Sequence, residues 1–317
     1  MSINAGQQHL NTLTVAQAAE LLLAGQVCAF PTETVYGLGG DATNADAVLS
    51  IYETKGRPRF NPLIMHCADL GMAEQLAMFS PLALRLAKLW PGSLTIVLPA
   101  RRGNGLADVA TAGLDTVGLR VPNHPLALEL LRTVGRPLAG PSANPSGKLS
   151  PTTAEQVRVS FGGNVPVLDG GPCEAGVEST IIRVLDDRLI QLRAGAIARE
   201  DIARTLGQEV EAVSGDAEIA APGMLASHYA PNALMRLNAE PRPGEAYLAF
   251  GAAQDFTGPM RNLSAKGDLR EAARNLFSML HQLDAERAET IAVASIPAHG
   301  LGEAINDRLQ RAAAPRP

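Results

Sequence analysis

Several residue patterns are missing from this chain of 317 residues, and each absence excludes a class of protein. Its cysteines, Cys28, Cys67 and Cys173, include no C-x-x-C pair, which argues against a disulfide framework and a structural zinc site. No apolar run approaches the ~18 residues that a membrane helix needs. The first residues contain no basic segment followed by an apolar one. We therefore expect no secretory signal, no membrane association and a cytoplasmic location.

The chain is also poor in aromatic residues and has no excess of positive charge. Aromatic side chains make up 4 % of the residues, and the formal net charge is −5. Proteins that bind RNA commonly present a basic surface with aromatic side chains on which bases stack. The composition therefore argues against a non-enzymatic RNA-binding module, and any anion site has to be built locally.

What remains is the composition of a globular protein with two domains. Hydrophobic residues make up 46 % and charged residues 19 % of the chain, and its length exceeds that of one ordinary core. Residues 208–235 show no periodicity and are acidic in their first half. We interpret them as a linker between a domain of residues 1–207 and a smaller domain of residues 236–317.

Apolar periodicity predicts helices and strands in irregular alternation. Thr14 and Gln17 form a capping-box pattern that begins a helix. Further helices are expected near residues 45–52, 82–89, 125–131, 154–159, 197–206, 269–283 and 301–312. Strands are expected near residues 27–30, 63–67, 94–98, 117–121, 165–168, 179–184, 189–192, 246–250 and 290–294. This order predicts an α/β fold with a mixed sheet and flanking helices, followed by a small α/β domain.

Three polar loops next to apolar runs carry most of the chemistry. They are Phe30-Pro-Thr-Glu-Thr-Val-Tyr-Gly-Leu-Gly39, Lys55-Gly-Arg-Pro58 with Asn61-Pro-Leu63, and Pro141-Ser-Ala-Asn144. They supply hydroxyls, amides and cations without a catalytic triad or a metal cluster, which suits a site for anions and small polar molecules. Neither a Rossmann fingerprint nor a P-loop is present, because the glycine spacing fails in both.

Each candidate also has a simpler structural interpretation. The hydroxyl groups of the first loop could serve only a turn, and Lys55, Arg57 and Arg59 could complement the dipole at a helix end. The glycine and proline between these cations stop the helix and stiffen the loop, which favours fixed guanidinium groups and anion recognition. His66 and Arg120 lie in strands, where a hydrogen-bonded or ion-paired structural role is the alternative.

The order and spacing of these segments resemble those of the Sua5/YrdC family in its longer, Sua5-type form. The resemblance extends over residues 14–235 and covers the final domain only by position and size. Besides the three loops, the matching segments are Trp90-Pro-Gly92, Thr116 with Arg120, Gly176-Val-Glu-Ser-Thr180, Pro222-Gly-Met224 and His228-Tyr-Ala-Pro231. The family implies a YrdC-like twisted mixed sheet and a small Rossmann-like domain at the C-terminal end.

The resemblance also implies a nucleotidyltransferase reaction. ATP, L-threonine and bicarbonate would give L-threonylcarbamoyl-adenylate, pyrophosphate and water. The product would feed the t6A modification at position 37 of tRNA, so the downstream t6A transferase machinery is an implied partner and contact with tRNA is indirect. Mg²⁺ is expected to accompany ATP by bridging phosphate oxygens, without a metal site on the protein.

Roles for individual residues follow from the same resemblance. Catalysis by positioning and charge stabilisation would fall to Lys55, Arg57, Ser142 and Asn144. L-Threonine would be held by Thr34, His66, Arg120, Ser179 and the backbone of Gly140. ATP would be bound by Arg57, Asn61, Thr116, Ser142, Ser150, Arg193 and Tyr229.

Tyr229 is far in sequence from the other residues implied for ATP. Its use in the site requires residues 222–231 to fold back as a lid; a passive tether is the alternative. Glu33 is left without a role. A hydrogenase-maturation carbamoyltransferase is disfavoured because the chain lacks cysteine-rich modules, and a purely structural protein would leave the polar loops unexplained.

Overall fold

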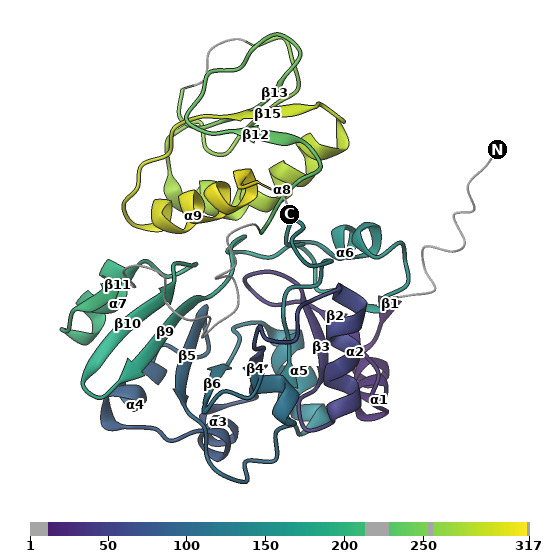
Figure 1. Cartoon of the computed structure of the whole chain (residues 1–317), viewed down its shortest axis with the longest axis vertical. Helices are drawn as coiled ribbons and strands as arrows, with labels where there is room; N and C mark the ends of the chain where they lie inside the picture. The colour runs from purple at the N-terminus through teal and green to yellow at the C-terminus, as the bar shows by residue number, and fades with distance from the viewer. Residues whose placement is uncertain (1–11, 213–227, 253–255, 316–317) are drawn as a thin grey trace.

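The computed structural model describes residues 12–212, 228–252 and 256–315, which form two units with one β-sheet each (Figure 1). In this view the smaller unit, from the C-terminal part of the chain, lies above the larger one. The predicted α/β class with a mixed main sheet is confirmed. In the described part of the chain, no helix combines the length and apolar character needed to span a membrane.

The larger unit is built on an eleven-stranded sheet. Its strands are β1 (Thr12–Leu13), β2 (Cys28–Phe30), β3 (Gly37–Asp41), β4 (Ile64–His66), β5 (Leu94–Pro99), β6 (Thr116–Arg120), β7 (Leu138–Ala139), β8 (Val167–Leu168), β9 (Thr180–Leu185), β10 (Arg188–Arg193) and β11 (Val210–Ala212). Its helices are α1 (Val15–Leu23), α2 (Ala45–Lys55), α3 (Leu70–Leu76), α4 (Pro81–Ala87), α5 (Pro125–Val134), α6 (Ala154–Ser160) and α7 (Arg199–Leu206), with a 3-10 helix over Asp108–Thr111. The strand order is β1-β8-β2-β3-β7-β4-β6-β5-β9-β10-β11.

Helices cover both faces of this sheet. Successive residues of β2 point to opposite faces: Cys28 and Phe30 pack with α1 and α5, whereas Ala29 joins a larger cluster with side chains of α2, α3 and α4. Helix α1 begins as predicted, because Thr14 and Gln17 cap each other reciprocally. With both faces covered, the strand ends and the loops after them are the parts left to form a site.

The sequence predicts a loop up to Gly39, and this is wrong beyond Tyr36. Residues Gly37–Asp41 form β3, which pairs antiparallel with β2. Glycine has little strand preference, so the pattern carries no strand signal. The glycines let the ring of Phe30 lie against the strand, since a Cβ at Gly37 or Gly39 would lie 3.0 Å from that ring. Five strands of two or three residues were also missed, because so short a segment shows no periodicity unless it lies in a longer apolar run. They are β1, β7 and β11 in the larger unit and β12 and β14 in the smaller one.

The smaller unit is a parallel sheet with two helices. Its strands are β12 (Leu234–Arg236), β13 (Ala246–Ala249), β14 (Met260–Asn262) and β15 (Thr290–Val293), and its helices are α8 (Leu269–Ala285) and α9 (Leu301–Ala313). The order is β12-β15-β13-β14, and each neighbouring pair is parallel. Figure 1 shows α8 and α9 on the side of this sheet that faces the larger unit.

Strands lie on both sides of the segment interpreted as the linker. β11 pairs with β10, so the larger sheet continues past residue 207 to Ala212. β12 begins the smaller sheet at Leu234. Residues 213–227, including Pro222-Gly-Met224, lie outside the described residues.

The two units approach each other closely. Val35, Leu149 and Val177 of the larger unit belong to the core cluster of the smaller one. Gly176 has a φ of 72°, and a Cβ on it would lie 2.3 Å from the carbonyl oxygen of Arg274 in α8. Only glycine fits this contact without moving one backbone away from the other.

We expect Gly176→Ala to lower the free energy of unfolding by about 1–3 kcal/mol, because its methyl group meets the backbone of Arg274 and disfavours the positive φ. Denaturant unfolding measures this change. Gly207→Ala is the matched control, since Gly207 has a φ of 62° and nothing within 4 Å of its Cβ position. Equal losses in both variants would show that the contact between the units contributes nothing.

Candidate functional site

A pocket lies where the polar loops of the larger unit meet next to the smaller unit. Its wall consists of strand ends and loops that are far apart in the sequence. The lining residues are Thr32, Thr34, Val35, Gly37, Arg57, Ile64, His66, Arg120, Gly140, Pro141, Ser142, Glu178, Ser179, Arg193, His228 and Tyr229.

Two of the predicted loops join to form one wall of this pocket. The amide of Ala143 donates to the carbonyl of Tyr36, and that of Leu38 donates to the carbonyl of Pro141, both at 2.7 Å. The Pro141–Asn144 loop therefore continues, beyond the end of β7, the antiparallel pairing of β7 with β3. This contact brings the hydroxyl-bearing segments around Thr34 and Ser142 together.

Lys55 and Asn144 support this wall from behind. The ammonium group of Lys55 donates to the carbonyl of Ser142 at 2.6 Å and to that of Asn144, and Asn144 Nδ2 donates to two carbonyls of its own loop. Burial, followed by the charge of Arg57, holds the pKa of Lys55 well below its usual range. Of the four residues predicted for catalysis, Arg57 and Ser142 line the pocket, whereas Lys55 and Asn144 hold the loop that carries Ser142.

The residues predicted to hold L-threonine all line the pocket. They are Thr34, His66, Arg120, Gly140 and Ser179. His66 and Arg120 are register partners at the ends of the parallel strands β4 and β6. The amide of Gly140 donates to the carbonyl of Ile64 at 3.0 Å, which fixes this backbone position beside β4. A Cβ at Gly140 would lie 2.8 Å from His66 Nδ1, so glycine makes room for the ring.

His66 presents a neutral imidazole to this pocket. Burial, followed by the positive charge of Arg120, lowers the pKa of His66 to about 3. Its Nδ1 is buried and has no hydrogen-bond partner among the described residues. At neutral pH the ring can therefore exchange a hydrogen bond with a ligand but carries no charge.

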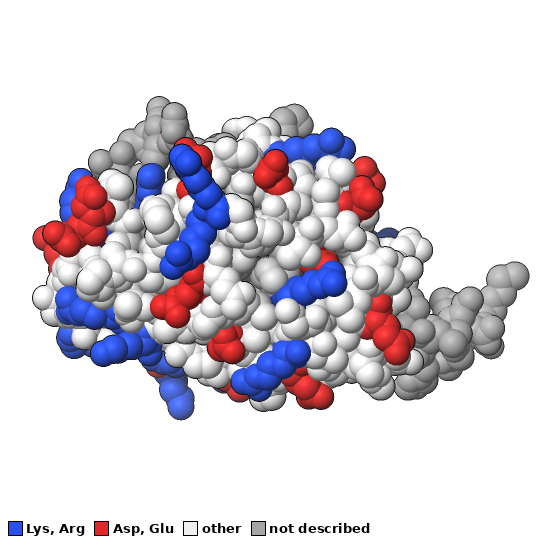
Figure 2. Space-filling view, turned by 90° about the horizontal axis from the view of Figure 1, so that it is seen from below, with Lys and Arg blue, Asp and Glu red and all other residues white. Residues whose placement is uncertain are grey.

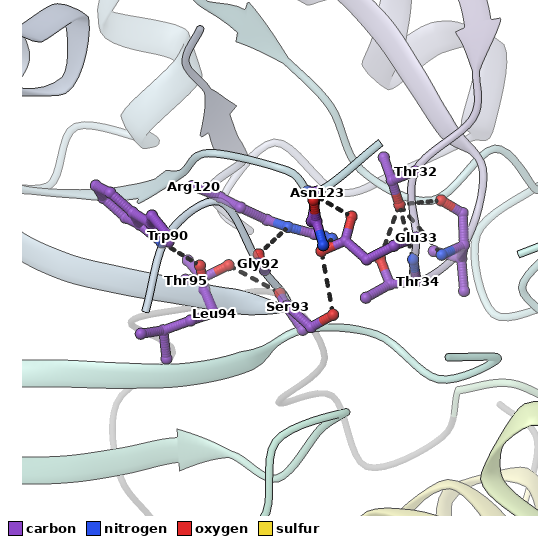
Figure 3. A network of polar contacts seen from close by, with 12 residues as sticks. Thr32, Glu33, Thr34, Trp90, Gly92, Ser93, Leu94, Thr95, Arg120 and Asn123 are labelled. Atoms are coloured by element: carbon purple, nitrogen blue, oxygen red, sulfur yellow. Dashed lines mark hydrogen bonds and ion pairs between the residues drawn. The ribbon is translucent and has the colours of Figure 1, made fainter. Parts of the chain in front are cut away.

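Arg120 is held by Glu33, the residue that the sequence left without a role (Figure 3). Arg120 Nη2 lies 2.8 Å from Glu33 Oε1, and both side chains are buried. The carboxylate also accepts hydrogen bonds from Ser93 Oγ at 3.1 Å and from the amide of Asn123 at 3.0 Å. Arg120 Nε donates to the carbonyl of Gly92 at 3.4 Å. These contacts fix the direction in which the guanidinium points and compensate its charge.

The residues predicted for ATP are only partly brought together. Arg57, Ser142, Arg193 and Tyr229 line the pocket. Ser150 lies behind the wall and donates to Glu178 Oε1 at 2.5 Å. Thr116 lines a separate small cavity. Asn61 is buried, and neither atom of its side-chain amide has a partner in the described part of the chain.

Two arginines of this set are fixed by backbone carbonyls. Arg57 donates from Nη2 to the carbonyl of Pro62 at 3.1 Å, and Arg193 donates from Nη2 to that of Ser179 at 2.8 Å. Burial lowers the pKa of Arg57 to about 10 and also lowers that of Arg193. An anion in the pocket would relieve the cost of burying these charges.

The segment around Tyr229 returns to the pocket, as its predicted use requires. Tyr229 is buried and lines the wall, and the amide of Ala230 donates to the carbonyl of Gly147 at 2.8 Å. A lid function of this segment stays a prediction.

The lining residues to which sequence reasoning assigned no role include Thr32, Val35, Glu178 and His228. Each of these four residues lies in one of the motifs described above, in which the resemblance implies a role only for neighbouring residues. Glu178 and His228 directly precede Ser179 and Tyr229. In a regular strand, the side chains of neighbouring residues point to opposite faces. These segments are irregular, so two neighbouring side chains can both face the pocket.

The pocket does not offer a ligand set for a metal ion. Among the described residues, no group of three or more His, Cys, Asp or Glu side chains is placed to hold one. Glu178 is the carboxylate in the lining, and its oxygens already accept hydrogen bonds from Ser150 and Arg308. A divalent ion would therefore have to arrive with a ligand that brings its own oxygens.

The buried histidines predict a pH-dependent stability. Burial lowers the pKa of both His66 and His228 from 6.5 to about 3. The unfolded chain binds these protons below pH 6.5 while the folded chain does not, so stability is lost as the pH falls from 6.5 towards 3. Each histidine contributes a slope of about 1.4 kcal/mol per pH unit in this window.

Denaturant unfolding between pH 6 and pH 4 tests this dependence. His66→Gln is expected to reduce the slope by one such contribution. His299→Gln, at an exposed position, serves as the control and is expected to leave the slope unchanged. A His66→Gln slope equal to that of the original chain would contradict the assignment.

Comparisons with known proteins agree with the motif resemblance. A Sua5/YciO/YrdC family model described as "Telomere recombination" matches residues 20–195, and one described as "Threonylcarbamoyl-AMP synthase, C-terminal domain" matches residues 197–314. Relatives named threonylcarbamoyl-AMP synthase include one from Bacillus subtilis (strain 168), 40 % identical and covering 96 % of this chain and 94 % of its own. Another, from Pyrococcus abyssi, is 39 % identical over 93 % of this chain and 92 % of its own.

A solved structure gives the same result. The structure of P. abyssi Sua5 complexed with L-threonine matches with a TM-score of 0.86 and 38 % identity, over 94 % of each chain. E. coli YciO matches with a TM-score of 0.52 and 25 % identity, covering 61 % of this chain and 91 % of its own. This chain therefore has both domains of the longer form of the family. The chain belongs to the Sua5/YciO/YrdC family.

Proposed function

We propose that this chain is a threonylcarbamoyl-AMP synthase, which converts ATP, L-threonine and bicarbonate into L-threonylcarbamoyl-adenylate, pyrophosphate and water. The observation that carries the proposal is the convergence of the buried cations Arg57, Arg120 and Arg193 on one pocket. Three anionic substrates repel one another, and fixed cations offset this repulsion. The full-length match to a Sua5 structure with L-threonine supports the same assignment.

The threonine half of the pocket suits carbamate formation. Arg120, held by Glu33, would pair with the carboxylate of threonine in a fork, and neutral His66 would exchange a hydrogen bond with the amino acid. Nearby positive charge favours loss of a proton from the threonine ammonium group. The free amine then attacks the carbon of bicarbonate and the N–C bond forms. The hydroxyl group takes a proton from the amine nitrogen and leaves as water, which gives the carbamate.

The arginine-rich half suits adenylation. A carbamate oxygen attacks the α-phosphorus, and the bond between this phosphorus and the pyrophosphate oxygen breaks. Arg57 and Arg193 would stabilise the charge that develops on the phosphate oxygens. Mg²⁺ is proposed to enter as the complex with ATP and to neutralise phosphate charge, since the described side chains offer it no site of their own.

Partners and location are part of the proposal. We place the enzyme in the cytoplasm, where its three buried free cysteines would stay reduced. Its product would pass to a t6A transferase machinery, and contact with tRNA would be indirect. Figure 2 supports this last point for one face of the molecule, because Lys and Arg are interspersed there with Asp and Glu.

The reaction is tested by mass spectrometry of the product with each substrate omitted in turn. Threonylcarbamoyl-adenylate is expected only when ATP, threonine and bicarbonate are all present. Arg57→Ala is expected to reduce its formation by about 100-fold or more, as for the loss of a donor to transition-state charge. Arg59→Ala, in the same loop but exposed, is the matched control. Near-normal pyrophosphate release by Arg57→Ala would refute its role.

Glu33→Gln tests the orientation of Arg120. We expect the KM for threonine to rise roughly tenfold, about 1.4 kcal/mol, while the KM for ATP stays unchanged, because the contact lies on the threonine side. Glu174→Gln changes an exposed carboxylate of the neighbouring cavity and is expected to change neither constant. Equal increases of both KM values in Glu33→Gln would indicate a general disturbance of the fold instead.

A further inference from the structure

Arg308, on α9 of the smaller unit, reaches the wall of the pocket in the larger unit. It is 1 % exposed. Its Nε donates to Glu178 Oε2 at 2.9 Å, and its Nη1 donates to Asp307 Oδ2 at 2.6 Å. Its Cζ lies 5.2 Å from the centre of the Tyr229 ring, a cation–π distance. One side chain thus contacts two residues that line the pocket.

These two contacts extend further along the wall. Glu178 holds Ser150 through its other oxygen, so Arg308, Glu178 and Ser150 form a chain of buried hydrogen bonds. Ser150 and Tyr229 are both residues that the family resemblance implies for ATP. The arginine therefore contacts one predicted ATP residue directly and another through a single carboxylate.

The conformation of Tyr229 depends on its surroundings. Its φ is 62°, in the left-handed region that aromatic residues rarely adopt. Such a conformation persists where packing holds it in place. The ring is enclosed by Phe277 of α8, with ring centres 5.5 Å apart, and by Arg308. Both of these contacts come from the smaller unit.

A purely structural role does not explain this arrangement. The two units are also joined by Gln191 with Glu303, by His281 with the carbonyl of Ser150, and by an apolar cluster. A buried ion pair is not generally more stabilising than a well-packed apolar contact. Attachment of the smaller unit therefore does not by itself require a charged guanidinium group with several N–H donors at this position.

We propose that Arg308 is a positioning residue that holds Tyr229 and Glu178 in place. Through it, the smaller unit completes the ATP side of the pocket. The inference rests on the proposed function for the identity of the nucleotide. It assigns to the smaller unit a part in the site itself. The smaller unit would then be required for nucleotide binding. It would not be required for threonine binding, because the residues proposed to hold threonine belong to the larger unit.

The test measures the binding of a non-hydrolysable ATP analogue and of L-threonine by calorimetry, together with thermal unfolding, for Arg308→Met and Arg308→Lys in the full chain. We expect Arg308→Met to weaken analogue binding at least tenfold and threonine binding less than twofold. Arg308→Lys is expected to be intermediate, because it keeps the charge but loses the fork. Glu303→Ala, which removes contacts between the units on the same helix, is the control and should bind both ligands normally.

A double-mutant cycle separates positioning from general stability. Arg308→Met combined with Tyr229→Ala is expected to weaken analogue binding by less than the two single changes would together if they were independent, because Arg308 acts in part through this ring. Additive losses, or analogue binding in folded Arg308→Met or Arg308→Lys equal to that of Glu303→Ala, would overturn the inference. A chain that binds the analogue but makes no threonylcarbamoyl-adenylate would contradict the proposed function and leave the Arg308 test intact.

Discussion

Several cationic side chains are buried around one pocket, and much of the site follows from the cost of keeping them there. A buried charge is costly unless hydrogen bonds or an opposite charge compensate it. Glu33 compensates Arg120, Glu178 compensates Arg308, and two carbonyls receive the ammonium group of Lys55. Arg57 has carbonyl partners but no ion pair with any described carboxylate, so an anionic ligand would compensate its charge.

The two carboxylates connect the pocket to different parts of the structure. Glu33 lies behind Arg120 and is bonded within the larger unit (Figure 3). Glu178 lies on the side of Tyr229 and is bonded to Arg308 of the smaller unit. The proposed threonine residues therefore depend on the larger unit alone, and the proposed ATP residues also depend on the contact between the units.

Much of the site could be predicted because its residues lie in short motifs. The order and spacing of these motifs resemble those of the family, and this resemblance assigned Thr34, His66, Arg120 and Ser142 to one site. Lys55 illustrates the limit: its motif marked it as part of the site, but only the structure shows its ammonium group on the carbonyls of the Ser142 loop. The glycine strand β3 was missed because its packing against Phe30 is not a periodic pattern.

The sequence by itself determined the α/β class, the family and the segments that carry the chemistry, because these depend on local periodicity and on motif order. The tertiary structure alone decided which groups pair with one another. Glu33 with Arg120 and Glu178 with Arg308 are separated by 87 and 130 residues, and no local pattern encodes a contact of that range. Compensation of buried charge depends on such contacts, so only the tertiary structure shows which group compensates each of these arginines.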